Sequence, residues 1–200
     1  MMGEPVTLKG HFVELRPLAP DDAAITFDWR GGARARLLNK AAASEQAQED
    51  WIRSRPANEH NWMICVKAGQ PVGMVSLVAI DPVHLHAEPG RFLIGDEQAV
   101  VGVPAAVEAM LLVYEFAFDT LGLVRLFGMI AEGNNRMVKW QKYLGMREEG
   151  RMREHYFIDG RFRDALMFGL LVDEYRAETL PRMKALIGMA RPTADQELTR

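Results

Sequence analysis

The sequence lacks the features that mark several classes of protein. Its 200 residues include one cysteine, Cys65, so a scaffold of disulfide bonds is excluded; because this cysteine lies in the apolar run "WMICV", we expect a buried thiol. No apolar run approaches the ~20 residues that span a bilayer, and the N-terminal residues lack the pattern of a secretory signal. The net charge of −3 favours neither nucleic acid nor a membrane as a partner. We therefore expect a cytoplasmic protein that acts on small molecules or on other proteins.

The composition is sufficient for one hydrophobic core. The chain is 48% hydrophobic and 26% charged, which suits a single domain better than two domains of half the length. We expect this domain to occupy residues 1–176. Residues 177–200 are predicted to form a C-terminal helix followed by a loose tail, because "ARPTADQELTR" is largely polar.

Periodicity in the sequence predicts a mixed α/β domain. "HFVELRPL" alternates apolar and polar residues as a half-buried strand does, whereas "SEQAQEDWIRS" begins with a capping serine and carries apolar residues at helical spacing. Similar patterns predict strands at 11–18, 62–66, 71–80, 90–95, 124–130 and on both sides of an Ile-Asp-Gly turn within 153–171, and helices at 23–30, 44–54, 105–121 and 134–144. The predicted order is β-α-α-β-β-β-α-β-α-β-β, with a mixed central sheet and helices on both faces.

The centre of the chain combines a strand, an irregular loop and a long apolar helix, in the segments "GRFLIG", "DEQAVVGVP" and "AAVEAMLLVYEFAFDTL". The first turn of such a helix offers unpaired N–H groups and the positive end of a dipole, which suit a phosphate group. The next strand and helix, in "VRLFGMIAEGNNRMVKWQKYLGM", are expected to lie beside the first strand. Two strands that separate at their ends leave backbone groups free to pair with an extended ligand that contains amides, such as a pantetheine arm.

These segments resemble the GNAT superfamily of acyl-CoA-dependent N-acyltransferases. The resemblance runs from about residue 7 to residue 176 and is carried by "VELRPL", "EAMLLVYEFAFDTLGLVRL", "NNRMVKWQKYLGM" and "REEGRMREHYFIDGRFRDALMFGLL". It implies the GNAT fold, an N-acetyltransferase activity and acetyl-CoA as the co-substrate, without a metal.

Within the superfamily, the chain is similar to the ribosomal-protein N-terminal acetyltransferases and more closely to the amino-sugar N-acetyltransferases of pseudaminic acid biosynthesis. The latter resemblance is carried by "FDWR" and by a helix with the pattern S-x-x-x-x-x-x-W. It implies acetylation of the 4-amino group of a UDP-linked dideoxy sugar used in flagellin glycosylation, by direct attack in a ternary complex. Two alternatives stay open: a protein or peptide N-terminus as acceptor, and a catalytically impaired domain that acts as a binding module. The sequence also leaves open whether the chain forms a homodimer.

The resemblance assigns a coenzyme site to the central strand and helix. Gly102 matches the first glycine of the family's pyrophosphate loop, but Pro104 replaces the second glycine and Val101 the usual basic residue. Asn134 matches the asparagine beside the pantetheine arm. Gln141 stands where many members place the tyrosine that protonates the thiolate, and an amide cannot supply that proton. The residues implied in coenzyme binding are Phe92, Leu93, Ile94, Gly102, Val103, Ala105, Ala106, Asn134 and Lys139.

Candidate bases lie in "HLHAE", just before the strand that is expected to line the cleft. They are His86 and Glu88, with His84 nearby. Two histidines with a carboxylate also occur in metal sites, but no further ligand cluster accompanies them, so we expect no metal. Surface histidines without a role are an alternative interpretation.

Candidate substrate contacts come from the N-terminal helices. Trp29 and Arg30 could contact a nucleotide-sugar, with Arg30 suited to a phosphate; core packing and a surface ion pair are the alternatives. Gln48 stands where the sugar branch often has a histidine, and Met129 where it often has a glutamate. The expected scaffold is therefore intact, while several chemical positions differ from the family.

Overall fold

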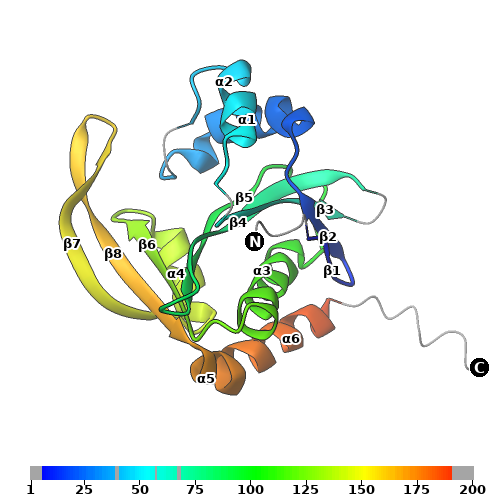
Figure 1. The fold of residues 1–200 in the computed structure, drawn as a ribbon, viewed down its shortest axis with the longest axis vertical. Coiled ribbons are helices and arrows are strands. Elements are labelled where there is room, and N and C mark those ends of the chain that lie inside the picture. The colour runs from blue at the N-terminus through cyan, green and yellow to red at the C-terminus, as the bar shows by residue number, and fades with distance from the viewer. Residues whose placement is uncertain (1–5, 39–40, 57, 67–68, 191–200) are drawn as a thin grey trace, which may run out of the picture.

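The computed structural model describes residues 6–38, 41–56, 58–66 and 69–190. Within them, eight strands form a sheet in the order β1-β2-β3-β4-β5-β6-β8-β7 (Figure 1). The strands are β1 (Leu8–Lys9), β2 (Val13–Pro17), β3 (His60–Val66), β4 (Pro71–Asp81), β5 (His86–Ile94), β6 (Arg125–Ala131), β7 (Arg147–Ile158) and β8 (Arg161–Leu171). The α-helices are α1 (Ala23–Gly31), α2 (Glu45–Arg53), α3 (Ala105–Glu115), α4 (Asn135–Tyr143), the single turn α5 (Val172–Glu174) and α6 (Leu180–Met189).

The sheet opens between its two central strands. Neighbouring strands are antiparallel except for β5 and β6, which are parallel and whose register covers only His86 with Arg125 and Ala87 with Leu126. Beyond these two pairs the strands separate. The sheet is therefore continuous at the start of β5 and β6 and open at their C-terminal ends.

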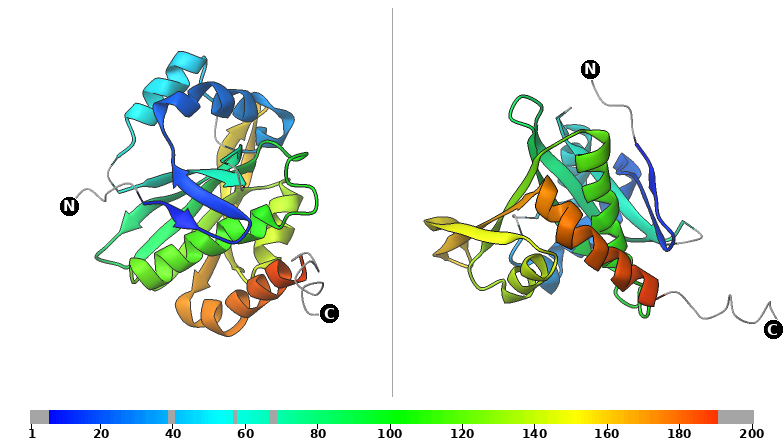
Figure 2. Two further views of the ribbon diagram at one scale, coloured as in Figure 1. Left: turned by 90° about the vertical axis from the view of Figure 1, so that its right-hand side faces the viewer. Right: turned by 90° about the horizontal axis from the view of Figure 1, so that it is seen from below.

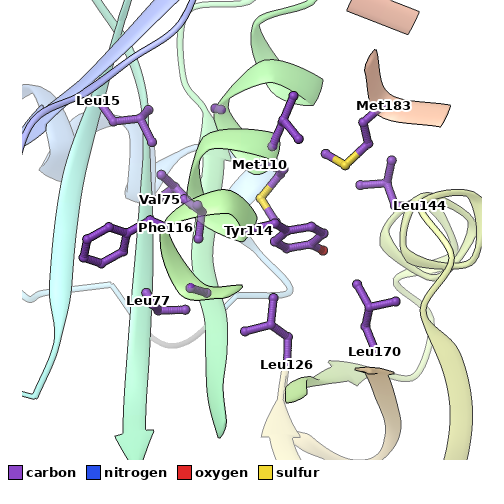
Figure 3. Close-up of a cluster of buried hydrophobic side chains, with 14 of the residues drawn as sticks. Leu15, Val75, Leu77, Met110, Tyr114, Phe116, Leu126, Leu144, Leu170 and Met183 are labelled. Atoms are coloured by element: carbon purple, nitrogen blue, oxygen red, sulfur yellow. The ribbon is translucent and has the colours of Figure 1, made fainter. Parts of the chain in front are cut away.

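Alternation along the strands directs side chains into two cores. On β3, Trp62 and Ile64 join the larger core, which α3 covers, whereas Met63 and Cys65 join a smaller core that residues of α1 cover. Figure 3 shows Tyr114 of α3 inside the larger core. Figures 1 and 2 show α1 and α2 grouped together, apart from α3 and α6. The predicted helices on both faces and the predicted burial of Cys65 are confirmed.

Two helices begin at side chains that cap them, and the capping serine of the first was predicted from the sequence. The Ser44 hydroxyl accepts the backbone N–H of Ala47 at 3.1 Å, at the start of α2. The Asn134 side chain accepts the N–H of Met137 at 3.3 Å, at the start of α4. These bonds satisfy donors that a helix leaves unpaired in its first turn.

Helix α3 is fixed to the N-terminal hairpin by Glu108, in its first turn. The Glu108 carboxylate accepts the backbone N–H groups of His11, Phe12 and Val13 at 2.7–2.8 Å. A β-carbon at Gly10 would lie 2.6 Å from this carboxylate. Glycine is therefore needed at position 10 for the close approach.

The predicted order of elements is confirmed, with the short strand β1 added before it. Two strands begin well before their predicted first residues. Strand β5 begins at His86 rather than at residue 90. The prediction was wrong because Pro89 and Gly90 are typical of a break in a strand. In the structure the backbone continues through them with an irregular register, in which Arg91 takes a φ of +52°. Strand β7 begins at Arg147 rather than at 153, because its side chains are mostly exposed and lack an apolar alternation.

The C-terminal region completes the larger core. Met183 and Ile187 of α6 are buried in that core, so the predicted C-terminal helix packs on the rest of the domain. Residues 191–200 of the predicted tail lie outside the described residues. In the described part of the chain, no helix is both long and apolar enough to cross a membrane.

Candidate active site

Where β5 and β6 separate, a cavity of about 420 Å³ opens between them. We call it the strand cavity, because its walls come mainly from residues 88–92 of β5, 128–131 of β6 and 155–158 of β7. Met137, Trp140 and Gln141 of α4 and Arg30 of α1 also reach it. The separation predicted from the sequence therefore forms a real cavity.

A second cavity of about 520 Å³ lies between β5 and α4. We call it the helix cavity. Both cavities share Leu38, Phe92, Asn134, Met137 and Trp140 as lining residues, so they form one continuous cleft. At the boundary, the rings of Phe92 and Trp140 are nearly parallel, with their centroids 6.4 Å apart.

Glu88 is the candidate base that lies in the strand cavity. Burial raises the pKa of its carboxyl group, while a hydrogen bond from the backbone N–H of Met129 and the positive charge of Arg91 partly oppose the rise. A carboxylate with a raised pKa in a cavity can accept a proton more readily than an exposed one. Because Glu88 on β5 accepts an N–H from β6, it also spans the gap where the strands no longer pair.

Tyr156 and His155 of β7 line the same cavity and were not predicted as site residues. Burial and the nearby charge of Glu88 raise the pKa of Tyr156. The register of β7 and β8 shifts between Met152 and Tyr156, and Glu154 takes a φ of +51°. This irregularity has no signal in the sequence, which is why the two side chains were missed.

Two arginines bring positive charge to the strand cavity. Arg91 donates to Glu59 at 2.7 Å and to Asn61 at 2.9 Å, and its guanidinium lies 5.1 Å from the Trp51 ring centre. Arg30, a predicted substrate contact, lines the strand cavity. Burial and the charge of Arg91 lower the pKa of Arg30, so the two guanidinium groups affect each other electrostatically.

The altered family positions also face the cleft. Met129 and Gln141 line the strand cavity, and the buried Oε1 of Gln141 has no hydrogen-bond partner among the described residues. Tyr143 does not reach the strand cavity; it is half exposed and lines the helix cavity. At the position where the resemblance places the acid, the strand cavity is therefore lined by an amide.

Of the residues implied in coenzyme binding, six line the helix cavity: Phe92, Leu93, Ile94, Ala106, Asn134 and Lys139. Gly102, Val103 and Ala105 line neither cavity and lie in or next to the loop before α3. Gly102 takes a φ of +76°, which favours glycine. The first helical hydrogen bond of α3 runs from Glu108 N–H to Pro104 O, so the N–H groups of residues 105–107 precede the helical bonds.

Three other predicted site residues lie outside both cavities. Gln48 is buried between α2 and α1, where its side-chain amide donates to the Thr26 hydroxyl at 3.1 Å. Trp29 packs against Gly95, where an added β-carbon would lie 2.1 Å from its ring. His86 belongs to the paired start of β5, and its ring contacts Phe127 edge-on. The structure thus gives Gln48 and Trp29 packing roles.

His86 belongs to a small cluster at the β4–β5 turn. The candidate ligand atoms of Asp81, His84 and His86 lie within 4.8 Å of one another. Asp81, the third member of this group, was not predicted from the sequence. Its carboxylate accepts the N–H groups of Val83 and His84 and pairs with the His84 ring at 2.9 Å, so these bonds account for the geometry of the turn.

The comparisons with known proteins identify the family. The model of the acetyltransferase (GNAT) domain matches residues 13–147, and the chain belongs to this family. The crystal structure of a GCN5-related N-acetyltransferase from Brucella melitensis is similar with a TM-score of 0.78 at 26% identity, over 96% of this chain and 88% of that chain. The predicted GNAT fold is confirmed.

Two curated relatives bear on the substrate. Spermidine N(1)-acetyltransferase of Escherichia coli K12 is 29% identical over 126 residues, which cover 63% of this chain and 64% of that protein. A Bacillus subtilis protein named as a ribosomal N-acetyltransferase is 32% identical over 110 residues, or 55% of this chain and 58% of that protein. The matches thus span less than two-thirds of either relative. Neither name mentions an amino sugar, so the pseudaminic acid assignment has no support from them.

Proposed function

We propose that this chain is an acetyl-CoA-dependent N-acetyltransferase in which Glu88 is the general base. The observation that carries the proposal is the position of Glu88: a buried carboxylate with a raised pKa, in the cavity where β5 and β6 separate. Membership of the GNAT family supports acetyl-CoA as the acetyl donor.

The reaction requires a neutral amine, because an ammonium group has no lone pair. In the proposed mechanism, the strand cavity holds the acceptor amine and Glu88 accepts its proton directly or through water. The amine attacks the thioester carbonyl of acetyl-CoA, a carbon–nitrogen bond forms and the carbon–sulfur bond breaks. The unpaired backbone groups of β5 beyond Ala87 support the binding of the pantetheine amides, which fixes the thioester beside the amine.

The departing thiolate needs a proton that Gln141 cannot donate. Among the described residues that line the strand cavity, Tyr156 carries the one hydroxyl group. A tyrosine hydroxyl is protonated at neutral pH, and burial with the nearby charge of Glu88 raises the pKa of Tyr156 further. We assign Tyr156 as the proton donor in place of the tyrosine that is missing from α4.

The charge of the strand cavity supports an acceptor with an anionic group. Among its described lining residues, Glu88 is the one carboxylate, whereas Arg30 and Arg91 are cations, and both arginines also interact with other groups of the chain. A polyamine would bring further positive charges close to these arginines, which is unfavourable. We therefore retain a nucleotide-linked amino sugar as the proposed acceptor, since its diphosphate supplies negative charge beside the amine.

The test measures thiol release from acetyl-CoA with three acceptors: a UDP-linked 4-amino sugar, spermidine and a peptide with a free N-terminus. The proposal expects the amino sugar to give the highest kcat/KM. Faster turnover of spermidine or the peptide would overturn the proposed acceptor and keep the transferase. No binding of acetyl-CoA at millimolar concentration would overturn the transferase itself and leave a binding module.

The role of Glu88 is tested by Glu88→Gln, which preserves the shape of the side chain. We expect kcat to fall by about 10²–10⁴-fold while the Kd for acetyl-CoA is unchanged, because general bases contribute rate enhancements of this size. Glu115→Gln is the matched control, since Glu115 lies at the end of α3 and pairs with Lys184 outside both cavities. Activity of Glu88→Gln within about threefold of the control would reject Glu88 as the base.

A further inference from the structure

The loop before α3 offers little positive charge to the phosphates of a coenzyme. Val101 replaces the basic residue that the family resemblance predicts there, and its side chain is 74% exposed. Pro104 contributes no N–H group. The N–H groups of Val100, Val101 and Val103 donate to carbonyl groups within the loop. Binding of a phosphate by this loop alone would therefore rest on few donors.

Two arginines from other elements converge on the same loop. Arg34, in the short helical turn Ala33–Ala35, and Arg136, in the first turn of α4, both contact a single oxygen of Glu97, Oε1. The Arg136 guanidinium lies 3.7 Å from that oxygen, and the Arg34 guanidinium is in direct contact with it. We call these three residues the Glu97 clasp. Burial and the charge of Arg136 lower the pKa of Arg34, as expected for two cations held close together.

The clasp borders the helix cavity. Arg34, Arg136 and Lys139 line that cavity, and no carboxylate does among its described lining residues. Glu97 does not line that cavity; it lines a shallow depression together with Trp29 and Gly95. The helix cavity therefore has positive charge on α4, from Arg136 and Lys139, and on the turn that carries Arg34, while the carboxylate that contacts the two arginines belongs to the loop.

We propose that Arg34 and Arg136 bind the phosphate groups of acetyl-CoA. In the absence of the coenzyme, the Glu97 carboxylate occupies the phosphate position between the two arginines, and the coenzyme displaces it on binding. This inference rests on the proposed use of acetyl-CoA. Glu97 and Arg136 are largely exposed, so their ion pair is weak and easily exchanged. A phosphate carries more charge than a carboxylate and binds two guanidinium groups through several oxygens. The positive charge that position 101 lacks is thus supplied by two distant segments.

The two parts of the clasp predict opposite effects on coenzyme affinity. Glu97→Gln removes the competing carboxylate, so the Kd for CoA is expected to fall about 3- to 10-fold. Arg34→Gln combined with Arg136→Gln removes the phosphate ligands, so the Kd is expected to rise by about tenfold or more. Pantetheine, which has no phosphate, should bind all variants equally.

Isothermal titration of the full chain with CoA and with pantetheine measures these effects. Glu148→Gln is the control, because Glu148 of β7 pairs with Lys142 of α4 at 2.8 Å and neither residue lines the strand cavity or the helix cavity. Unchanged or weaker CoA binding by Glu97→Gln, or equal CoA binding by the double arginine variant and wild type, would overturn the clasp while leaving the transferase intact. Failure of the wild type to bind CoA would overturn both.

Discussion

The carboxylate of Glu108 is predicted to be a main stabilising contact between α3 and the N-terminal hairpin. It accepts three backbone N–H groups at 2.7–2.8 Å, from residues 11, 12 and 13, and its side chain is buried. Glu108→Gln keeps the volume but replaces one acceptor oxygen by an NH₂ donor. If the amide oxygen takes the place of Oε2, it keeps the bonds from the N–H groups of Phe12 and Val13. The N–H of His11 then faces the amide NH₂, which is also a donor.

The expected loss follows from these bonds. One backbone donor left unsatisfied costs about 1–3 kcal/mol, and the two bonds that remain lose their charge assistance, although removing a buried charge offsets part of this. We therefore expect Glu108→Gln to lower the free energy of unfolding by about 2–3 kcal/mol. For a chain of this length, that corresponds to a decrease in Tm of roughly 4–12 °C.

Urea denaturation, followed by tryptophan fluorescence, measures this loss. Glu115→Gln on the same helix is the control, since Glu115 forms an exposed ion pair with Lys184 and should change stability by less than about 0.5 kcal/mol. Gly10→Ala tests the same contact from the other side, because its β-carbon would lie 2.6 Å from the carboxylate. A loss below about 1 kcal/mol for Glu108→Gln would refute the reasoning.

Two further predictions concern the cleft. Because burial raises the pKa of Glu88 and the base is its ionised form, kcat/KM should fall as the pH decreases through a pKa above the ordinary glutamate value; a pH–rate profile with no such acidic limb would contradict this. Gly95→Ala should destabilise the fold by about 1–3 kcal/mol, because the new β-carbon would lie 2.1 Å from the Trp29 ring. Gly31→Ala is the control, since its new β-carbon would have nothing within 4 Å and should not destabilise the fold. Equal denaturation midpoints for the two variants would reject the packing role of Trp29.

Much of the fold was predictable because its signals are local. Ser44 and Asn134 cap helices through side chains that act within three residues, and the unbroken apolar run "WMICV" reflects two buried faces of β3. The start of β5 was not predictable in this way. Its Pro-Gly pair resembles a break, whereas the strand continues through an irregular register with β4, in which Arg91 takes a left-handed conformation.

The candidate site likewise contains some residues that were predicted from the sequence and some that were not. Phe92 and Asn134 were located by segments that the family resemblance covers, and both line the cleft. Tyr156 was missed because a register shift in β7 turns it toward Glu88, which no local pattern records. The convergence of residues 34, 97 and 136 was also missed, because it depends on how three separate segments pack.

The separation of β5 from β6 gives this sheet two additional edges inside the molecule. An exposed edge strand is normally a hazard, because its free N–H and C=O groups can pair with a strand of another protein molecule and start aggregation. Here the inner edges face a cleft bordered by α4 and β7, which admits a slender extended molecule but leaves little room for a strand of a folded protein. The fold can therefore keep unpaired backbone groups permanently available for a ligand while limiting their exposure to other chains.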